Sequence, residues 1–190
     1  MDKMPRLRTS ALDGRPPDER RRLQALFADA WETGCISEER IRTGCVYEAQ
    51  PAASYSLCVL RFDPRLSGRR QIPFHEWWPE LAPTTPLVKG YRTLDTHGQR
   101  AISWAAFAQS YFAELDALPT RLLVSLVEEL CELPCRYMSV TLLGCEHPTA
   151  ADELRVRCHR RLLRLWLLGQ ADAFVNSLER APALVGKGAR

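Results

Sequence analysis

Residues 137–144 read Tyr-Met-Ser-Val-Thr-Leu-Leu-Gly, a short and largely apolar run that ends in glycine. Residues 55–62 form a second such run, Tyr-Ser-Leu-Cys-Val-Leu-Arg-Phe. Runs of this length and composition are typical of strands covered on both faces, as in the parallel sheets of α/β proteins. Residues 41–47 alternate more loosely and are predicted as a further strand. These three segments predict a small sheet.

The segments around these strands show the apolar spacing of helices. Predicted helices cover residues 17–33, 74–81, 104–115, 121–133 and about 149–168. Ser103 and Thr120 are the predicted N-caps of two of them, and Thr149 with Asp152 resembles a capping box. Residues 83–86 are predicted as a turn within a long connection.

The order of strands and helices predicts an α/β fold, with a small, mostly parallel sheet, helices packed on its faces and an N-terminal helical extension. Three regions are expected. Residues 1–40 form a basic flexible arm and an amphipathic helix, residues 41–169 form the α/β domain, and residues 170–190 form a C-terminal tail.

Composition narrows the class of protein. The chain has 190 residues, of which 46% are hydrophobic and 26% charged, so it is not a disordered chain. No apolar stretch approaches the ~18 residues of a membrane span, and the first 22 residues lack the apolar segment of a secretory signal. The chain has seven cysteines, an odd number that cannot all pair in disulfides, and we expect them to be reduced thiols. A cytoplasmic protein without membrane association or an obligatory cofactor is therefore expected.

Several segments, in their order along the chain, resemble a known family. They are Cys45–Glu48, Leu60–Arg65, Glu76-Trp77 with Leu81–Thr85, Trp104 to Leu115 with aromatic residues at 107 and 111, and Gly144–Glu146 with Cys158–Arg160. On these motifs, residues 41–169 resemble the bacterial YeaO-like branch of the domain-of-unknown-function 488 (DUF488) family. Leu60, Asp63, Leu66 and Gly144 depart from the family pattern. The resemblance implies a compact cytosolic α/β domain and specifies no reaction.

Candidate ligand contacts follow the two clearest strands. Arg61, Asp63 and Arg65 come after one, and Glu146 comes after the other. If the strands are parallel neighbours, these groups share the crevice at the carboxyl edge of the sheet. The arginines could then bind an anionic substrate, with Glu146 as an acid or base. The alternative is a structural ion pair between Arg61 and Glu146.

Aromatic side chains complete the predicted pocket. Trp77 and Tyr111 are further candidate substrate contacts, and a tryptophan at a pocket mouth would suit a planar ligand. The alternative is that Trp77 and Trp78 anchor the predicted short helix, one in the core and one toward a rim.

Cys158 and His159 are further catalytic candidates, as a nucleophile and its base. The side chains of adjacent helical residues point about 100° apart, so Cys158 and His159 are not expected to form a hydrogen bond with each other. The alternative is a core thiol beside a buried, hydrogen-bonded histidine. A third possibility is metal binding through Cys145, Cys158 and His159.

Four arginines, Arg157, Arg160, Arg161 and Arg164, are expected to form one stripe on the last helix. Such a stripe is usually a solvated face, but it could bind nucleic acid or an acidic protein. The net charge of +3 is too small for a typical nucleic-acid-binding domain. The leading interpretation is thus a small-molecule pocket for an anionic metabolite, and the rival is a non-enzymatic interaction module. The sequence leaves open whether the domain is an enzyme, and its oligomeric state.

Overall fold

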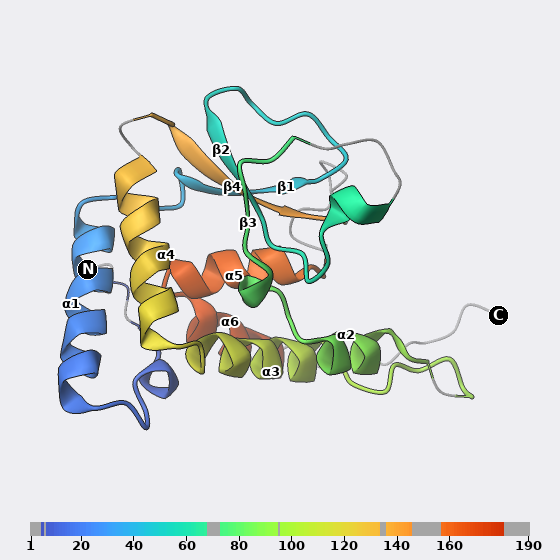
Figure 1. Ribbon diagram of the computed structural model, residues 1–190. Helices are drawn as coiled ribbons and strands as arrows, with labels where there is room; N and C mark the ends of the chain where they lie inside the picture. The colour runs from blue at the N-terminus through green and yellow to red at the C-terminus, as the bar shows by residue number, and fades with distance from the viewer. Residues whose placement is uncertain are drawn as a thin grey trace.

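The computed structural model describes residues 5, 7–67, 73–94, 96–133, 136–145 and 157–180. Within them, four parallel strands form one sheet in the order β1-β4-β2-β3 (Figure 1). The strands are β1 (Ile41–Cys45), β2 (Ser54–Cys58), β3 (Glu76–Trp77) and β4 (Ser139–Gly144). The three strands predicted from sequence are confirmed, and so is their parallel arrangement.

The register of the strands brings their carboxyl ends together. Cys45 of β1 lies opposite Gly144 of β4, and Cys58 of β2 lies opposite Leu143. The segments that follow β1, β4 and β2 therefore leave the sheet at the same edge. In an α/β sheet this edge is where ligands bind.

Strand β3 replaces the short helix that was predicted over residues 74–81. The His75 N–H donates to Ser56 O at 2.9 Å, and the Trp78 N–H donates to Cys58 O at 2.9 Å. The open edge of β2 thus satisfies the backbone here, and Pro79 favours an extended residue before it. Only a 3-10 turn, η3 (Pro79–Leu81), remains of the predicted helix.

Six α-helices are present in the described residues. They are α1 (Pro17–Glu32), α2 (Thr85–Arg92), α3 (Trp104–Asp116), α4 (Thr120–Glu132), α5 (His159–Leu167) and α6 (Ala171–Arg180). Ser103 is confirmed as the N-cap of α3, since its Oγ accepts the Ala106 N–H at 3.1 Å. Thr120 is instead the first residue of α4, because Pro119 takes the cap position.

Two helices lie where none was predicted. The prediction of a turn at residues 83–86 missed α2, and the predicted tail carries α6. The helix predicted from Thr149 begins in the described residues only at His159, and residues 146–156 lie outside them. None of the described helices is long and apolar enough to cross a membrane.

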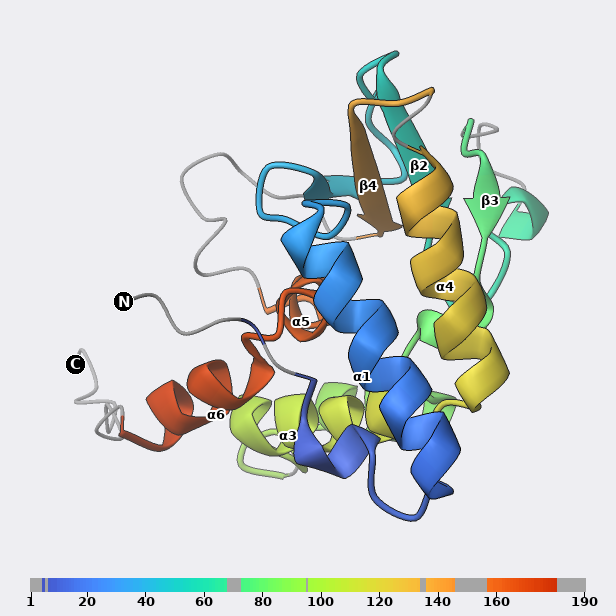
Figure 2. The ribbon, with the colours of Figure 1, turned by 90° about the vertical axis from the view of Figure 1, so that its left-hand side faces the viewer.

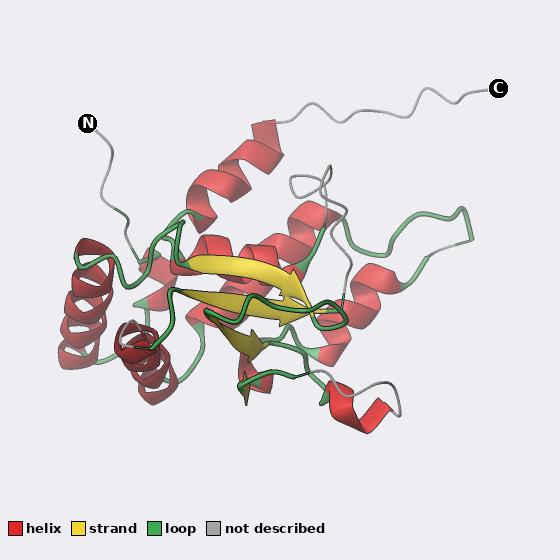
Figure 3. Ribbon diagram, turned by 90° about the horizontal axis from the view of Figure 1, so that it is seen from above, coloured by secondary structure: helices red, strands yellow, loops and turns green. Residues whose placement is uncertain are grey.

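The helices cover one face of the sheet. Helix α5 lies against β1 and β4, with α3 packed on its far side (Figure 1). Helices α1 and α4 lie side by side (Figure 2), and in the view from above they lie beside the sheet, to the left of the strands (Figure 3). The main apolar core lies between the sheet and these helices, with Phe27, Phe112 and Trp166 among its largest buried side chains.

The opposite face of the sheet carries small polar residues. Ser54 Oγ lies 2.6 Å from Thr141 Oγ1, and Ser139 Oγ donates to Ser54 Oγ at 3.1 Å. The loop after β1 returns over this face, where Gln50 Nε2 donates to Cys45 O at 2.9 Å and to Glu48 O at 2.8 Å. This covering loop explains why the β2 and β4 segments are buried on both faces.

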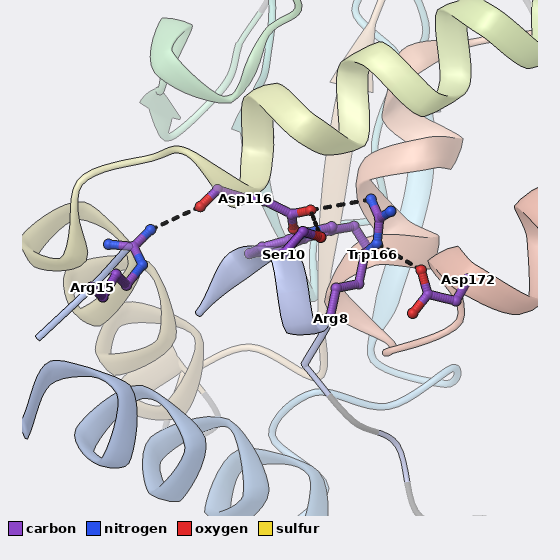
Figure 4. A network of polar contacts seen from close by, with 6 residues as sticks. All are labelled: Arg8, Ser10, Arg15, Asp116, Trp166 and Asp172. Atoms are coloured by element: carbon purple, nitrogen blue, oxygen red, sulfur yellow. Dashed lines mark hydrogen bonds and ion pairs between the residues drawn. The ribbon is translucent and has the colours of Figure 1, made fainter. Parts of the chain in front are cut away.

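The N-terminal segment, predicted as a flexible arm, is docked from Leu7 onward. It forms a 3-10 turn, η1 (Thr9–Ala11), whose Ala11 is fully buried. Asp116, at the end of α3, accepts the Ser10 hydroxyl at 2.5 Å and the Trp166 indole N–H at 2.8 Å (Figure 4). Arg8 Nη1 lies 3.2 Å from the same carboxylate, as a charge pair.

Candidate ligand-binding site

A cavity of about 500 Å³ opens at the carboxyl edge of the sheet. Small-molecule sites typically occupy ~300–1,000 Å³. Segments that follow β1, β2, β3 and β4 form part of its wall, and α2, α3 and the start of α5 complete it. Its lining includes Tyr47, Leu60, Arg61, Phe62, Asp63, Ala82, Pro83, Tyr91, Arg92, Arg100, Trp104, Phe107, Cys145, Arg157 and His159.

The cavity is strongly basic. Four of its lining residues are arginines, and Asp63 is the one acidic residue among the described lining residues. Arg8, Arg21, Arg22 and Arg65 each lie within 4.0 Å of a carboxylate. Among the described residues, by contrast, none of the four cavity arginines has a carboxylate within 4.0 Å. The positive charge of the cavity is therefore not neutralised by these residues.

Arg61, predicted as an anion contact, does line the cavity. Its Nε donates to Pro83 O at 3.3 Å, and its Nη2 donates to Ala82 O. Both acceptors are neutral backbone carbonyls, so these bonds hold the guanidinium in place without cancelling its charge. Arg61 is thereby fixed between the segment after β2 and the turn before α2.

Arg65 does not line the cavity. Its guanidinium forms an ion pair with Asp63, in which Nη2 lies 2.7 Å from Oδ2. The guanidinium also lies 4.8 Å from the centre of the Phe74 ring. The Arg65 hydrogen bonds hold the pKa of the Asp63 carboxyl below its ordinary value. Asp63 is at the cavity wall, but its carboxylate is already engaged by Arg65.

Trp77 and Tyr111 lie behind the wall. The Trp77 indole N–H donates to Leu60 O at 2.7 Å, and the Tyr111 hydroxyl donates to Leu81 O. Tyr111 is 1% exposed, and burial raises the pKa of its hydroxyl well above the ordinary value. Both side chains support segments that line the cavity, and neither is among the lining residues.

His159 is at the cavity wall, at the first residue of α5. Its Nε2 lies 2.9 Å from Val59 O, and a carbonyl can only accept, so Nε2 carries a proton. This bond joins α5 to the end of β2 and fixes the orientation of the ring.

Cys158 is separated from this wall although it is adjacent in sequence. Its side chain is 2% exposed and does not line the cavity. The thiol at the wall is that of Cys145, just after β4. Beneath it, burial raises the pKa of the Cys58 thiol to about 11, so this thiol is neutral at ordinary pH.

Glu146, the predicted acid or base, lies outside the described residues, and so its pairing with Arg61 is not described. Within the described residues, no group of three or more His, Cys, Asp or Glu side chains is placed to hold a metal ion.

The four arginines predicted as one stripe have different environments. Arg157 precedes α5 and is exposed at the cavity, whereas Arg160 is 2% exposed. Arg164 Nε donates to Ile41 O at 2.6 Å, and Arg161 lies 6.0 Å from the centre of the Phe174 ring. They do not form a common exposed face, because α5 lies against the sheet and α6.

A larger groove, of about 980 Å³, lies between the N-terminal segment and α1. Asp13, Arg20 and Arg21 are among its lining residues, so charges of both signs face it. It is lined by residues 5–31 alone and lies away from the strand ends. The cavity at the carboxyl edge is therefore the better candidate site.

Sequence reasoning missed several lining residues. Phe62, Tyr91, Arg92, Arg100 and Trp104 were not proposed as ligand contacts. The signal for Tyr91 and Arg92 was present, since Pro86 in the first turn of α2 is a common helix start. Arg100 and Trp104 reach the site through tertiary packing, and no pattern in the sequence near them indicates this position.

A family model described as the active DUF488-N3 subclade matches residues 41–171. The match covers more than half of the chain, and its bounds are close to the domain predicted from sequence. It confirms the resemblance at the level of the family and leaves the YeaO-like branch a prediction. No curated protein and no solved structure matches the chain.

Proposed function

The chain belongs to the DUF488 family, and from that premise we propose that the cavity at the carboxyl edge of its sheet binds a small anionic metabolite. The observation that carries the proposal is the set of four arginines at one cavity without carboxylate partners among the described residues. Arg61 is half-buried and the other three are exposed, so the cavity carries a concentrated positive potential that attracts an anion from solution. A ligand with a phosphate or carboxylate group would supply the negative charge.

Arginine suits this role because its planar guanidinium binds the oxygen atoms of phosphate and carboxylate in pairs. Arg61 is already held by backbone carbonyls, so less conformational freedom is lost when it binds a ligand. The start of α5 adds to the attraction, since the N-terminus of a helix carries partial positive charge.

We also propose His159 as the acid–base group of the site. The hydrogen bond to Val59 O holds its ring at the cavity wall, which supports proton transfer to or from a bound ligand. The description of the matched subclade as active supports a retained functional site, although it specifies no reaction.

Calorimetric titration with inorganic phosphate and pyrophosphate tests anion binding. We expect a dissociation constant on the order of 1 mM or tighter. Arg157→Gln should weaken binding roughly tenfold or more, because a hydrogen bond to a charged group contributes about 1.5–3 kcal/mol. Arg21→Gln is the matched control, since it removes another exposed arginine, on α1 and outside this cavity. Absence of binding, or equal loss in both variants, would refute the proposal.

Histidine NMR tests the second part. A bound anion favours the imidazolium form, so pyrophosphate should raise the pKa of His159. The ring signals of His97, which does not line the cavity, are the reference for non-specific changes in chemical shift. His159→Gln assigns the signal. An unchanged His159 titration in the presence of saturating pyrophosphate would exclude contact with the bound anion.

A further inference from the structure

The cavity has an aromatic side as well as a basic one. Tyr91 of α2 and two residues of α3, Trp104 and Phe107, lie against one another with ring centres 4.9–5.6 Å apart. Trp104 and Phe107 are stacked, with their planes 14° apart. The Arg100 guanidinium lies 4.4 Å from the centre of the Tyr91 ring. This side of the cavity is therefore a packed group of flat surfaces.

Phe62 is the more exposed of two exposed aromatic residues at the cavity. It follows β2 beside Arg61, and 72% of its surface is exposed. Covering a phenyl ring that is exposed to water is favourable. Tyr47, also at the cavity, is 39% exposed. Large exposed apolar groups at a cavity often mark a surface that a ligand covers.

A simple anion would leave these aromatic surfaces unused. The cavity has a volume of about 500 Å³, and a phosphate ion is far smaller than this space. A ligand with a planar ring joined to a phosphate group matches both sides of the cavity at once. Stacking of a base on an aromatic side chain contributes ~1–3 kcal/mol.

We propose that the ligand is a free nucleoside monophosphate, with its base against Phe62 and its phosphate at Arg61 and Arg157. This proposal rests on the anion site proposed above and adds the class of the ligand. The number of basic groups at the wall exceeds that of acidic ones, which suits the double negative charge of a phosphate ester.

Calorimetric titration of the full chain with AMP, ribose 5-phosphate and inorganic phosphate tests the proposal. AMP should bind at least about tenfold more tightly than ribose 5-phosphate, because the base alone distinguishes the two. Phe62→Ala should abolish this difference and leave the affinity for ribose 5-phosphate unchanged. The substitution is at an exposed position, so the variant should fold.

Leu66→Ala is the matched control. Leu66 is 85% exposed and close in sequence to Phe62, but it does not line the cavity. This variant should bind AMP as the wild type does. Equal losses in the two variants would refute a role for Phe62 in stacking.

The remaining outcomes separate the two proposals. Equal affinities for AMP and ribose 5-phosphate would overturn the nucleotide assignment and leave the anion site standing. Failure of all three compounds and of pyrophosphate to bind would overturn both. A 5′-phosphorylated single-stranded oligonucleotide that binds more tightly than AMP would overturn the assignment to a free nucleotide.

Discussion

Gly44 lies near the end of strand β1, at a position without room for a side chain. A β-carbon built there would lie 2.7 Å from Gln50 Oε1 and 2.8 Å from Thr141 Cγ2. Gln50 is held by two hydrogen bonds to backbone carbonyls, and Thr141 is buried in the central strand β4. The glycine thus allows the loop after β1 to lie close to the sheet.

Gly44→Ala is expected to destabilise the fold by about 1–3 kcal/mol, the usual cost of inserting a group into a packed site. Gly90→Ala in α2 is the control, because its nearest neighbour, Ile102 Cδ1, is 3.6 Å from the added carbon. This second change should stabilise the protein by up to about 1 kcal/mol, since alanine favours a helix. Urea denaturation measures both, and equal effects would contradict the role given to Gly44.

The Cys58 thiol provides a second prediction for a single residue. Its pKa is raised to about 11 from an ordinary value of 9.0, and the side chain is fully buried. The thiolate is the reactive form, so alkylation by iodoacetamide at pH 8 should be roughly 100-fold slower than for an exposed cysteine. Peptide mass spectrometry compares Cys58 with the partly exposed Cys145. Similar rates at the two sites would contradict the expected burial.

At the scale of elements, local patterns predicted what depends on local spacing. The stripe of α1 and the cap of α3 are examples, since both are defined by neighbours within a few residues. Strand β3 was missed because its extended form depends on the free edge of β2. The arginine stripe was misjudged because the surroundings of Arg160 and Arg164 are set by packing against the sheet and α6.

Asp116 joins the N-terminal segment, α3 and α5 in one network. Its carboxylate is 4% exposed and has contacts with Arg8, Ser10 and Trp166. Asp116→Asn should lower the free energy of unfolding by about 2–4 kcal/mol. Whichever oxygen is replaced by NH2, the new donor faces an N–H of Arg8 or of Trp166, and the charge of Arg8 loses its buried partner.

The matched control for Asp116 is Asp172→Asn. Asp172 also binds Arg8, with Nε at 2.7 Å from Oδ1, but its side chain is 64% exposed. Exposed ion pairs contribute below about 1 kcal/mol, so this variant should be close to wild type in a urea titration. Equal destabilisation by the two substitutions would show that burial of the carboxylate is not what matters.

At the scale of the whole molecule, the candidate site is formed by segments far apart in the chain. The rule that ligands bind at the carboxyl edge of a parallel sheet placed Arg61 at the cavity from sequence alone. The aromatic side of the cavity could not be predicted in this way, because α2 and α3 reach it only through the tertiary fold. The ion pair between Arg65 and Asp63 could not be predicted from the sequence either.

The region matched by the family model, residues 41–171, packs against residues that precede it in the chain. The family model begins at residue 41, yet Leu23, Phe27 and Ala30 of α1 are fully buried in the main core. The Trp31 indole N–H donates to Leu167 O at 2.8 Å, and the ring of Phe27 lies edge-on to Trp166, at 5.7 Å. Helix α1 is therefore part of the structural core of the domain.

Stepwise removal of the N-terminus should consequently have graded effects. A chain that begins at residue 7 keeps the contacts of Arg8, Ser10 and Arg15 and is the reference for the two shorter chains. One that begins at residue 16 loses Arg8, Ser10 and Arg15 but keeps α1, so it should fold with reduced stability. One that begins at residue 35 lacks Phe27, and the loss of a buried phenylalanine side chain alone lowers stability by about 3–5 kcal/mol. The free energy of unfolding of a typical domain is only ~5–15 kcal/mol. Circular dichroism during heating should therefore show no cooperative unfolding transition for the chain that begins at residue 35. A sharp transition for this chain would mean that residues 35–190 fold without α1, and would contradict the prediction.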